Sequence, residues 1–371
     1  VFDKRVAVDA SLQPSQLAMC FVCQAILTPD EQASPEYIEG ESCPHCLEPP
    51  EESLAALLKR RHAQIRDAAT PLPGSTPYDN VRPIRVSQKH EGLEVLDFLD
   101  AIHTRLSRDE WRKVCQRGEL ECEGEIVRPG FIVRAGQRLR HRIPATIEPD
   151  VNAAIEILHE DEAIVVVDKP APLPMHSGGR FHRNTLSHIL GEVYAPTRLR
   201  PAHRLDADTT GVVVLCKTRQ IASVMHDQFA AGKVGKVYIA RVHGHPREDR
   251  FECRLPIADE PGPNGVRLPI ETGAPAATTF EVIQRDDDGT SLLLVQPLTG
   301  RTNQIRVHLW ALKHPIVGDA IYRPGGETGP AASRSMGDPP LCLHAPELSF
   351  AHPINKQLVR VNTDCHAWER M

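Results

Sequence analysis

The sequence predicts an α+β protein whose largest domain is built on a mixed, largely antiparallel β-sheet. Two observations predict this class. From residue 150 onward, short runs rich in β-branched residues recur between turn residues, and segments with helical spacing are few. Before residue 150 the composition changes twice, from a cysteine-containing stretch to a helix-forming one and then to a basic one. We therefore expect one large domain over residues 150–371, with two smaller modules N-terminal to it.

The composition bounds the class of protein. The chain has 371 residues, 41% of them hydrophobic and 25% charged, which is typical of soluble globular proteins of two or three domains. No apolar run approaches the ~18 residues that a membrane span needs, and no secretory signal is present. Six of the ten cysteines are scattered, which favours free thiols in a reducing cytoplasm. The first residue is Val, so we expect the chain to begin inside a longer polypeptide.

The charge distribution limits how the chain can meet nucleic acid. A net charge of −6 argues against a protein that simply coats nucleic acid. The charge is uneven, however, because residues 105–142 contain ten Lys or Arg residues against six Asp or Glu residues. Contact with RNA is therefore expected to be regional.

Two Cys-x-x-Cys pairs in residues 1–50 predict a metal site. Nineteen residues separate the pairs, which fits a tetrahedral zinc site with each pair in a tight knuckle. Four thiolates leave no open coordination position, so the Zn²⁺ ion is expected to be structural. The open alternatives are buried free thiols and the replacement of one thiolate by His45. The predicted ligands are Cys20, Cys23, Cys43 and Cys46.

Residues 51–81 are expected to form a helix and a linker. Strong helix formers with apolar spacing of three and four predict a helix over 53–68 that Ser53 caps. The stretch Thr-Pro-Leu-Pro-Gly-Ser-Thr-Pro at 70–77 cannot continue a helix and predicts a linker.

Residues 82–144 predict a second small module. Helices are expected around Val95–Leu99 and Trp111–Val114, and short strands around Glu121–Cys122 and Gly136–Leu139. This pattern resembles an S4-type RNA-binding module. Phosphate contact is the functional interpretation of its basic residues, and a solvated charged helix face is the alternative. The predicted RNA contacts are Arg108, Arg112 and Lys113.

The most informative stretch lies in the large domain, where strands are expected at 164–167, 212–215, 238–242, 278–283 and 292–295 and a helix at 222–231. Asp206 stands in an arginine-flanked loop just before a Thr-Thr-Gly turn and a buried strand. Such rigid support presents a reactive side chain at a cleft, so Asp206 is the candidate active-site carboxylate. The alternative is a turn-capping role, which is the expectation for Asp208.

Two further segments carry candidate residues. In Gly235–Gly244, period-two alternation places Lys236 and Tyr238 on one face of a strand, so both can point to a cleft. A tyrosine in a strand is otherwise a core residue, and Lys236 an edge lysine. The segment Leu298–Leu309 contains Gly-Arg-Thr-Asn-Gln-Ile-Arg-Val-His-Leu, and a Pro-Ile-Val-Gly-Asp-Ala-Ile-Tyr segment follows it. His203, His308 and His344 lack metal-ligand spacing and are expected to support loops.

Together these segments resemble the motifs of the RluA-type RNA pseudouridine synthases, in order and over residues 155–360. His203-Arg204-Leu205-Asp206 is similar to the start of the family signature His-Arg-Leu-Asp-x-x-Thr-Ser-Gly, with Thr210 in place of Ser. The resemblance implies that Asp206 is the catalytic aspartate, that Tyr238 stacks on the target uracil, and that Arg306 pairs with Asp206. A nearby guanidinium keeps a carboxylate charged and oriented. Asn303 departs from the usual His. The substrate-binding residues implied are Arg204, Lys236, Arg301, Ile305 and His203.

The resemblance implies the conversion of uridine in RNA to pseudouridine. The reaction breaks the N1–C1′ bond, turns the detached uracil and joins C5 to C1′. Nothing is added or lost, so no cofactor is expected for catalysis. The sequence Gly-Arg-Phe-His-Arg-Asn-Thr at 179–185 favours tRNA over ribosomal RNA as the partner. The first region also resembles the C-terminal tail of rhodanese-type tRNA uridine hydroxylases, which points the same way.

Two other classes of function stay open at this point. One is a catalytically silent RNA-binding protein that keeps a synthase-like fold, against which the intact set Asp206, Tyr238 and Arg306 argues. The other is a nucleosidase or base-excising hydrolase, which would use a similar carboxylate but release free uracil. The sequence does not predict the modified position or the oligomeric state.

Overall fold

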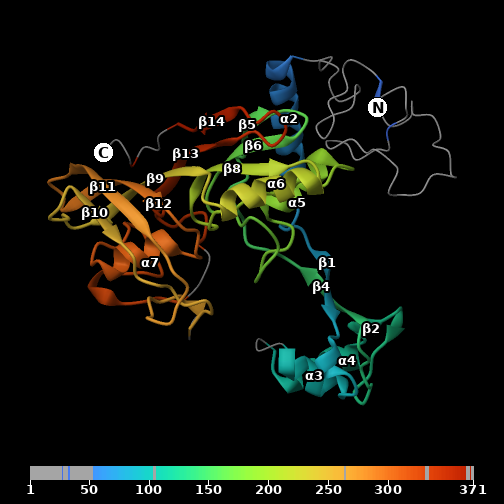
Figure 1. Cartoon of the computed structure of the whole chain (residues 1–371). Helices are drawn as coiled ribbons and strands as arrows, with labels where there is room; N and C mark the ends of the chain where they lie inside the picture. Colours follow the sequence, from blue (N-terminus) through green and yellow to red (C-terminus); the bar gives the residue numbers. More distant parts are fainter. Residues whose placement is uncertain are drawn as a thin grey trace. The chain divides into compact units, whose positions relative to one another are not determined.

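The computed structural model describes residues 27, 32–33, 53–102, 106–262, 265–330, 334–364 and 368 (Figure 1). These residues form two compact units. Unit 1 holds the described residues up to Pro73 and from Asp150 onward, and unit 2 runs from Gly74 to Pro149. The four cysteines predicted to bind zinc, Cys20, Cys23, Cys43 and Cys46, lie outside the described residues. Among the described residues, no helix is long and apolar enough to cross a membrane.

Unit 1 is built on one 10-stranded sheet in the order β10-β11-β12-β9-β13-β8-β6-β5, with β14 beside β13 and β7 beside β8. The pairs are antiparallel except that β13 and β8 run parallel over a short stretch. The mixed, largely antiparallel sheet predicted from the sequence is therefore confirmed. Its strands are β5 (Glu156–Glu160), β6 (Ile164–Lys169), β7 (Arg200–Pro201), β8 (Thr210–Cys216), β9 (Gly235–His243), β10 (Arg250–Cys253), β11 (Thr278–Arg285), β12 (Thr290–Pro297), β13 (Leu343–Ala351) and β14 (Leu358–Asn362). Its helices are α2 (Leu54–Ala68), α5 (Leu186–Tyr194), α6 (Arg219–Ala230) and α7 (Gln304–Ala311), with a short 3-10 turn, η6 (Pro324–Gly326).

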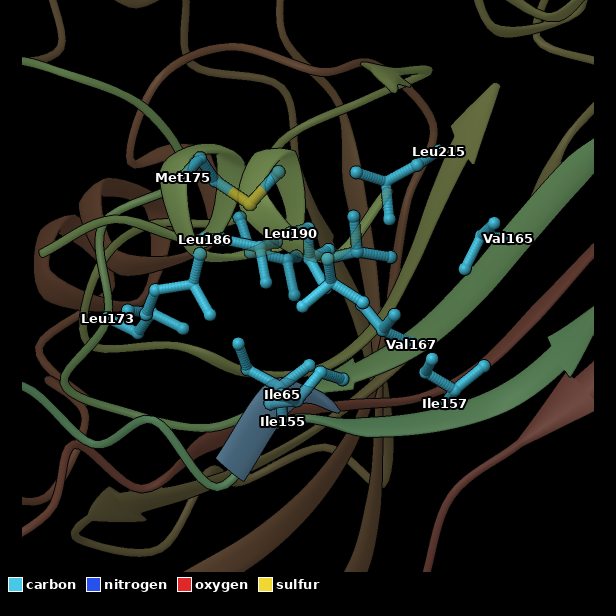
Figure 2. Packing of buried hydrophobic residues seen from close by; sticks show 14 of the residues in the cluster. Ile65, Ile155, Ile157, Val165, Val167, Leu173, Met175, Leu186, Leu190 and Leu215 are labelled. Carbon is cyan, nitrogen blue, oxygen red and sulfur yellow. The ribbon is translucent and has the colours of Figure 1, made fainter. Parts of the chain in front are cut away.

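The central strands of unit 1 are covered on both faces, which explains their uninterrupted valine runs. Alternate residues of β6 and β8 point to opposite sides. Val166 and Val214 pack with α6, whereas Val165 and Val213 belong to the cluster that includes α5 and α2. Figure 2 shows Leu186 and Leu190 of α5 facing Val167 across this second cluster, with Ile65 of α2 closing it below.

The other end of the sheet carries α7. Ile305 and Leu309 of this helix are buried against Leu293 and Val295 of β12 and Ala240 of β9. The packing fixes the direction of the helix, and therefore of the arginine between these two anchors.

Unit 2 places two helices on a four-stranded antiparallel sheet in the order β1-β4-β2-β3. Its core joins Phe98 and Leu99 of the first helix with Trp111 of the second and Leu139 of the sheet. Ser107 opens the second helix with a capping box completed by Glu110. The elements are β1 (Tyr78–Arg85), η4 (Gln88–His90), α3 (Val95–Ile102), α4 (Arg108–Arg117), β2 (Leu120–Cys122), β3 (Glu125–Ile126) and β4 (Arg138–Thr146).

The structure differs from the sequence-based boundaries at three points. The helix expected at 53–68 is present as α2, but it packs into unit 1 through Ile65, which is 2% exposed, instead of standing apart from the large domain. The division between residues 81 and 82 falls inside β1. In addition, β4 starts at Arg138 and continues to Thr146, beyond the Gly136–Leu139 strand expected, because exposed arginines alternate with buried residues along it.

Candidate active site

The loop that carries Asp206 lies between β7 and β8, and hydrogen bonds hold it to the domain core. The Thr209 backbone N–H donates to the Asp206 carbonyl at 3.2 Å and closes a turn. The buried Lys169 Nζ donates to three carbonyls, those of Pro170, Leu173 and Ala207, at 2.8, 3.0 and 3.2 Å. Burial lowers the pKa of Lys169 to about 7, although neighbouring aspartates oppose this shift. These contacts hold the backbone beside Asp206 rigid.

The Thr-Thr-Gly turn after Asp206 is held by a close contact between strands. Gly211, at φ 122°, pairs with Ala345 of β13, and a Cβ atom on it would lie 2.3 Å from the Ala345 carbonyl oxygen. No other residue fits this approach without moving the backbone. The Thr210 hydroxyl and His344 Nδ1 are hydrogen-bonded at 2.8 Å, so the hydroxyl at the position of the usual Ser has a structural partner.

Arg306 brings two carboxylates together. Its Nη1 lies 3.4 Å from Oδ2 of Asp206, and its Nε and Nη2 donate to the two carboxylate oxygens of Asp319 at 2.7 and 2.8 Å. The Arg306 and Asp319 side chains are 5% and 0% exposed, whereas the Asp206 side chain is 24% exposed. The pKa of Arg306 is raised, because the effect of the two carboxylates outweighs burial. Asp206 thus has a charged neighbour on one side and solvent on the other.

Tyr238 and Lys236 occupy alternate positions of β9 and both face the cavity, as the period-two pattern predicts. Burial, with the negative charge of Asp206 nearby, raises the pKa of the Tyr238 phenol. Lys236 Nζ donates to the Thr299 carbonyl at 3.0 Å, and burial lowers the pKa of this amine. The phenol therefore stays protonated at neutral pH, which favours a role as a stacking face or proton donor.

The structure brings all eight predicted catalytic and substrate-binding residues of unit 1 to one cavity of about 520 Å³. This volume lies within the range of sites that hold small molecules. Loops and elements that are distant in sequence form the walls: the loop before β8, the start of β9, the loop after β12, α7 and the end of α6. The residues are Asp206, Tyr238, Arg306, Arg204, Lys236, Arg301, Ile305 and His203.

The substrate-binding candidates differ in their exposure and in their contacts with the protein. Arg204 is exposed, and Arg301 is exposed with its Nε donating to the Pro275 carbonyl at 3.1 Å. Ile305 is buried and supplies an apolar wall. His203 stacks on Phe229 at 4.8 Å, and its Nε2 accepts from the Val214 backbone N–H at 3.2 Å. Burial, with Lys236 nearby, lowers the pKa of His203 to about 3, so its neutral ring supports the loop at the cavity wall.

Asn303, where the family has His, starts α7 in the left-handed conformation at φ 57°. Asn is one of the residues that adopts this conformation readily. Its Oδ1 lies 3.5 Å from Arg306 Nη1, and its Nδ2 donates to the Tyr322 hydroxyl at 3.3 Å. The side chain therefore links the arginine to the aromatic ring beside it.

The capping role expected for Asp208 is wrong. Asp208 is buried, and its Oδ1 has no hydrogen-bond partner among the described residues. Burial raises the pKa of this carboxyl group, against the attraction of Arg306, Arg334 and Lys169. The loop closes through the backbone of Asp206 and Thr209 instead of through this side chain.

The histidines act as structural bridges, as the sequence predicts. His308 joins the Thr278 hydroxyl and the Leu255 carbonyl at 2.9 and 3.0 Å, and His344 joins Thr210 to Thr363. In the described part of the chain, no cluster of three or more His, Cys, Asp or Glu side chains could hold a metal ion.

Sequence reasoning missed Asp319 as a site residue. It belongs to the Pro-Ile-Val-Gly-Asp segment, and its Oδ1 also accepts from the backbone N–H groups of Ile321 and Tyr322. The signal that could have found it is an acidic residue in a motif thirteen positions after a buried arginine. Lys169 was also missed. The signal that could have found it is its place at the end of an apolar strand, where a buried charged residue needs hydrogen-bond partners.

Two of the three basic residues predicted to bind RNA in unit 2 form ion pairs within the unit. Arg108 pairs with Asp97 and Arg112 pairs with Asp109, all on the exposed helix surface. Lys113 lines a hollow together with Arg117 and His141.

Comparison with known proteins shows which family the chain is similar to. The family model of RNA pseudouridylate synthases matches residues 163–311. An uncharacterized RNA pseudouridine synthase of Synechocystis sp. is 30% identical over 269 residues, which cover 72% of this chain and 92% of that protein. The dual-specificity RNA pseudouridine synthase RluA of Pasteurella multocida is 35% identical over 56% of this chain and 92% of its own length. The human pseudouridylate synthase RPUSD2 is 40% identical over 49% of this chain, but the match spans 32% of RPUSD2. The chain belongs to the RluA-type family of RNA pseudouridine synthases, enzymes that isomerise uridines in RNA.

Proposed function

We propose that this enzyme converts specific uridines in structured RNA to pseudouridine, with Asp206 as the catalytic carboxylate. The observation that carries the proposal is the convergence of Asp206, Arg306 and Tyr238 in one cavity. The N1–C1′ bond breaks and a C5–C1′ bond forms, while C5 loses a proton to solvent and N1 takes one up. Neither oxidant nor energy source enters this balance, so catalysis requires no cofactor.

The residues divide the work as follows. Asp206, partly exposed to the cavity, adds to the sugar or base or removes a proton, in the manner of a carboxylate nucleophile or base. Arg306 orients it from a buried position. Tyr238 offers its ring to the uracil, and the apolar wall at Ile305 helps to retain the base while it is detached.

The target uridine must leave its stack to reach this cavity. Extrusion of a base costs roughly a few kcal/mol, and least in a loop or distorted stem. Arg204 and Arg301 are exposed and line the cavity, so they are available to the displaced nucleotide and its phosphate. We propose that Lys236, whose Nζ donates to the Thr299 carbonyl, and His203 act mainly by shaping the wall.

We propose tRNA, in preference to ribosomal RNA, as the substrate class. What supports this choice is the Gly-Arg-Phe-His-Arg-Asn-Thr wording and the likeness of residues 1–50 to the tail of a tRNA-modifying enzyme. In the same way we propose that unit 2 is an S4-like module that holds flanking RNA, with Arg108, Arg112 and Lys113 as the contacts that the sequence suggests. Two helices on a small sheet are compatible with that proposal.

We also propose a structural zinc ion on Cys20, Cys23, Cys43 and Cys46. The two Cys-x-x-Cys pairs and their spacing support it. Thiolate ligands need a reducing compartment, and the described cysteines are free, so we propose a cytoplasmic enzyme. A Cys20→Ser/Cys43→Ser variant should lose zinc in elemental analysis and still form pseudouridine. A parent protein without stoichiometric zinc would exclude the site.

The decisive experiment maps pseudouridine in the total RNA of cells with and without the gene. We expect one or a few uridines, in tRNA, to lose the modification and to regain it when the purified protein acts on that RNA. If no position changes, the chain is a silent RNA-binding protein. Release of free uracil from the RNA would instead identify a base-excising hydrolase.

A further inference from the structure

The sheet of unit 2 has one covered and one open face. Leu139 of β4 and Ile84 of β1 point to α3 and α4 and are buried among their apolar residues. Because side chains alternate along a strand, the neighbours of these residues point away from the helices. Those neighbours include Arg85 of β1 and Arg138 and Arg140 of β4, and all three are exposed. We call these three residues the arginine face.

The arginine face carries unbalanced positive charge. Arg85 and Arg138 are directly opposite each other in the antiparallel register of β1 and β4. Like charges at such positions destabilise a sheet. None of the three arginines forms an ion pair among the described residues, although Glu121 stands opposite Arg140 in the register of β2 and β4. The next arginine along the strand, Arg142, is neutralised by Asp79 at 2.9 Å.

The helix surface of the same unit is different. Arg108, Arg112 and Arg117 of α4 are each paired with a carboxylate, from Asp97, Asp109 and Glu119. A phosphate would have to displace these partners before it could bind there. On the arginine face, a phosphate would instead relieve a repulsion that already exists.

We propose that the arginine face of unit 2 binds the phosphate backbone of the substrate RNA. The proposal rests on the proposed function, because it concerns the same RNA. Two side chains on one face of a strand are separated by roughly 7 Å, which is similar to the separation of successive phosphates. Arginine also binds phosphate at two points with its planar donor fork. Such contacts position the RNA and carry no base specificity.

The test compares two triple variants of the whole chain, both in an Asp206→Asn background so that the RNA is bound but not converted. One is Arg85→Gln/Arg138→Gln/Arg140→Gln. The matched control, Arg250→Gln/Arg254→Gln/Arg360→Gln, removes the same charge from three surface arginines of unit 1 that are paired with carboxylates. The affinity of each for an unmodified folded tRNA transcript is measured at several KCl concentrations.

We expect the sheet variant to bind at least tenfold more weakly at moderate salt, with the slope of log affinity against log salt reduced by about 2–3. The control should change the slope by less than about one. Unchanged affinity and slope in the sheet variant, or a larger loss in the control, would overturn the proposal. Because binding is measured without turnover, a parent that makes no pseudouridine would defeat the proposed function and leave this result intact.

A single substitution separates binding from folding. Arg138→Glu places a carboxylate opposite Arg85 and converts a repulsive pair into an attractive one. We expect its melting temperature to equal or exceed that of the parent while its affinity for the transcript falls. A variant that binds as tightly as the parent would contradict the proposal, whatever its stability.

Discussion

Asp319 binds Arg306 at two points, at 2.7 and 2.8 Å, and leaves Nη1 of the arginine facing Asp206 at 3.4 Å. The two contacts with Asp319 have the length of strong charge-assisted hydrogen bonds, and the contact with Asp206 is longer and weaker. The buried pair therefore fixes the plane of the guanidinium, and the partly exposed carboxylate of Asp206 stays available to a substrate. Orientation comes from Asp319, and chemistry from Asp206.

The first prediction concerns Asp319→Asn, which keeps the shape but removes the charge that compensates buried Arg306. Breaking one partner of a buried ion pair costs about 3–5 kcal/mol. We expect a lower free energy of unfolding in urea and a fall in kcat of at least tenfold, with KM nearly unchanged. Asp287→Asn, at an exposed position, is the control. Full kcat in folded Asp319→Asn would show that Arg306 needs no positioning.

The second prediction concerns the Tyr238 hydroxyl. Burial and Asp206 raise the pKa of this phenol, so its ionisation should not appear in the pH–rate profile below about pH 10. We expect Tyr238→Phe to bind RNA as the parent does and to turn over roughly a hundredfold more slowly, as for loss of a proton-transfer group. Single-turnover rates test this. A variant as fast as the parent would leave only stacking to Tyr238.

The third prediction separates the conformation of Asn303 from its side chain. Asn303→Gly keeps the left-handed backbone but removes the amide that faces Arg306 and Tyr322. Loss of such a hydrogen bond costs about 1 kcal/mol, so we expect kcat to fall about fivefold. Asn303→His, the usual family residue, should retain more activity than Asn303→Gly. If both variants match the parent, the amide has no role in placing Arg306.

The fourth prediction is a pH dependence of stability. Burial, with repulsion from Glu156 on the neighbouring strand, raises the pKa of Asp168 to about 6, from an ordinary value of 3.8. The folded state therefore holds this proton longer than the unfolded state, and its contribution to stability is lost as the pH rises from about 4 to about 6. At pH 7, Asp168→Asn should be more stable than the parent by roughly 1 kcal/mol.

Urea unfolding at pH 4 and pH 7 measures this difference. Glu156→Gln removes the repelling partner and should stabilise the protein in the same direction. The prediction fails if Asp168→Asn changes stability equally at both pH values.

The predicted site residues line one cavity, in part because their local signals coincide with strand periodicity. Lys236 and Tyr238 share a face of β9 by simple alternation, and the Asp206 loop ends at an uninterrupted apolar strand. Asp319, the second carboxylate partner of Arg306, was not predictable by such rules. It depends on how the chain after α7 returns to the helix, which is a tertiary contact without a local period.

Charged residues explain the other differences. The sequence predicts a strand only as far as Leu139, yet the buried Leu139 and His141 between the exposed arginines belong to a strand that continues to Thr146. The opposition of Arg85 and Arg138 follows from strand register, which neither segment specifies alone. Asp208 is of a residue type that often caps turns, which is why the sequence predicts a cap there. Its burial near Lys169 and Arg306 appears only in the folded chain.

The most direct measurement is the formation of pseudouridine in RNA labelled with tritium at uracil C5, because joining C5 to C1′ releases that tritium to water. The parent enzyme should release it and form an equal amount of pseudouridine. Asp206→Asn should bind the same RNA with similar affinity. Its turnover should fall by at least roughly a thousandfold, as when an enzyme loses its essential nucleophile or base. Turnover of Asp206→Asn within tenfold of the parent would contradict the assignment of Asp206 as the catalytic carboxylate.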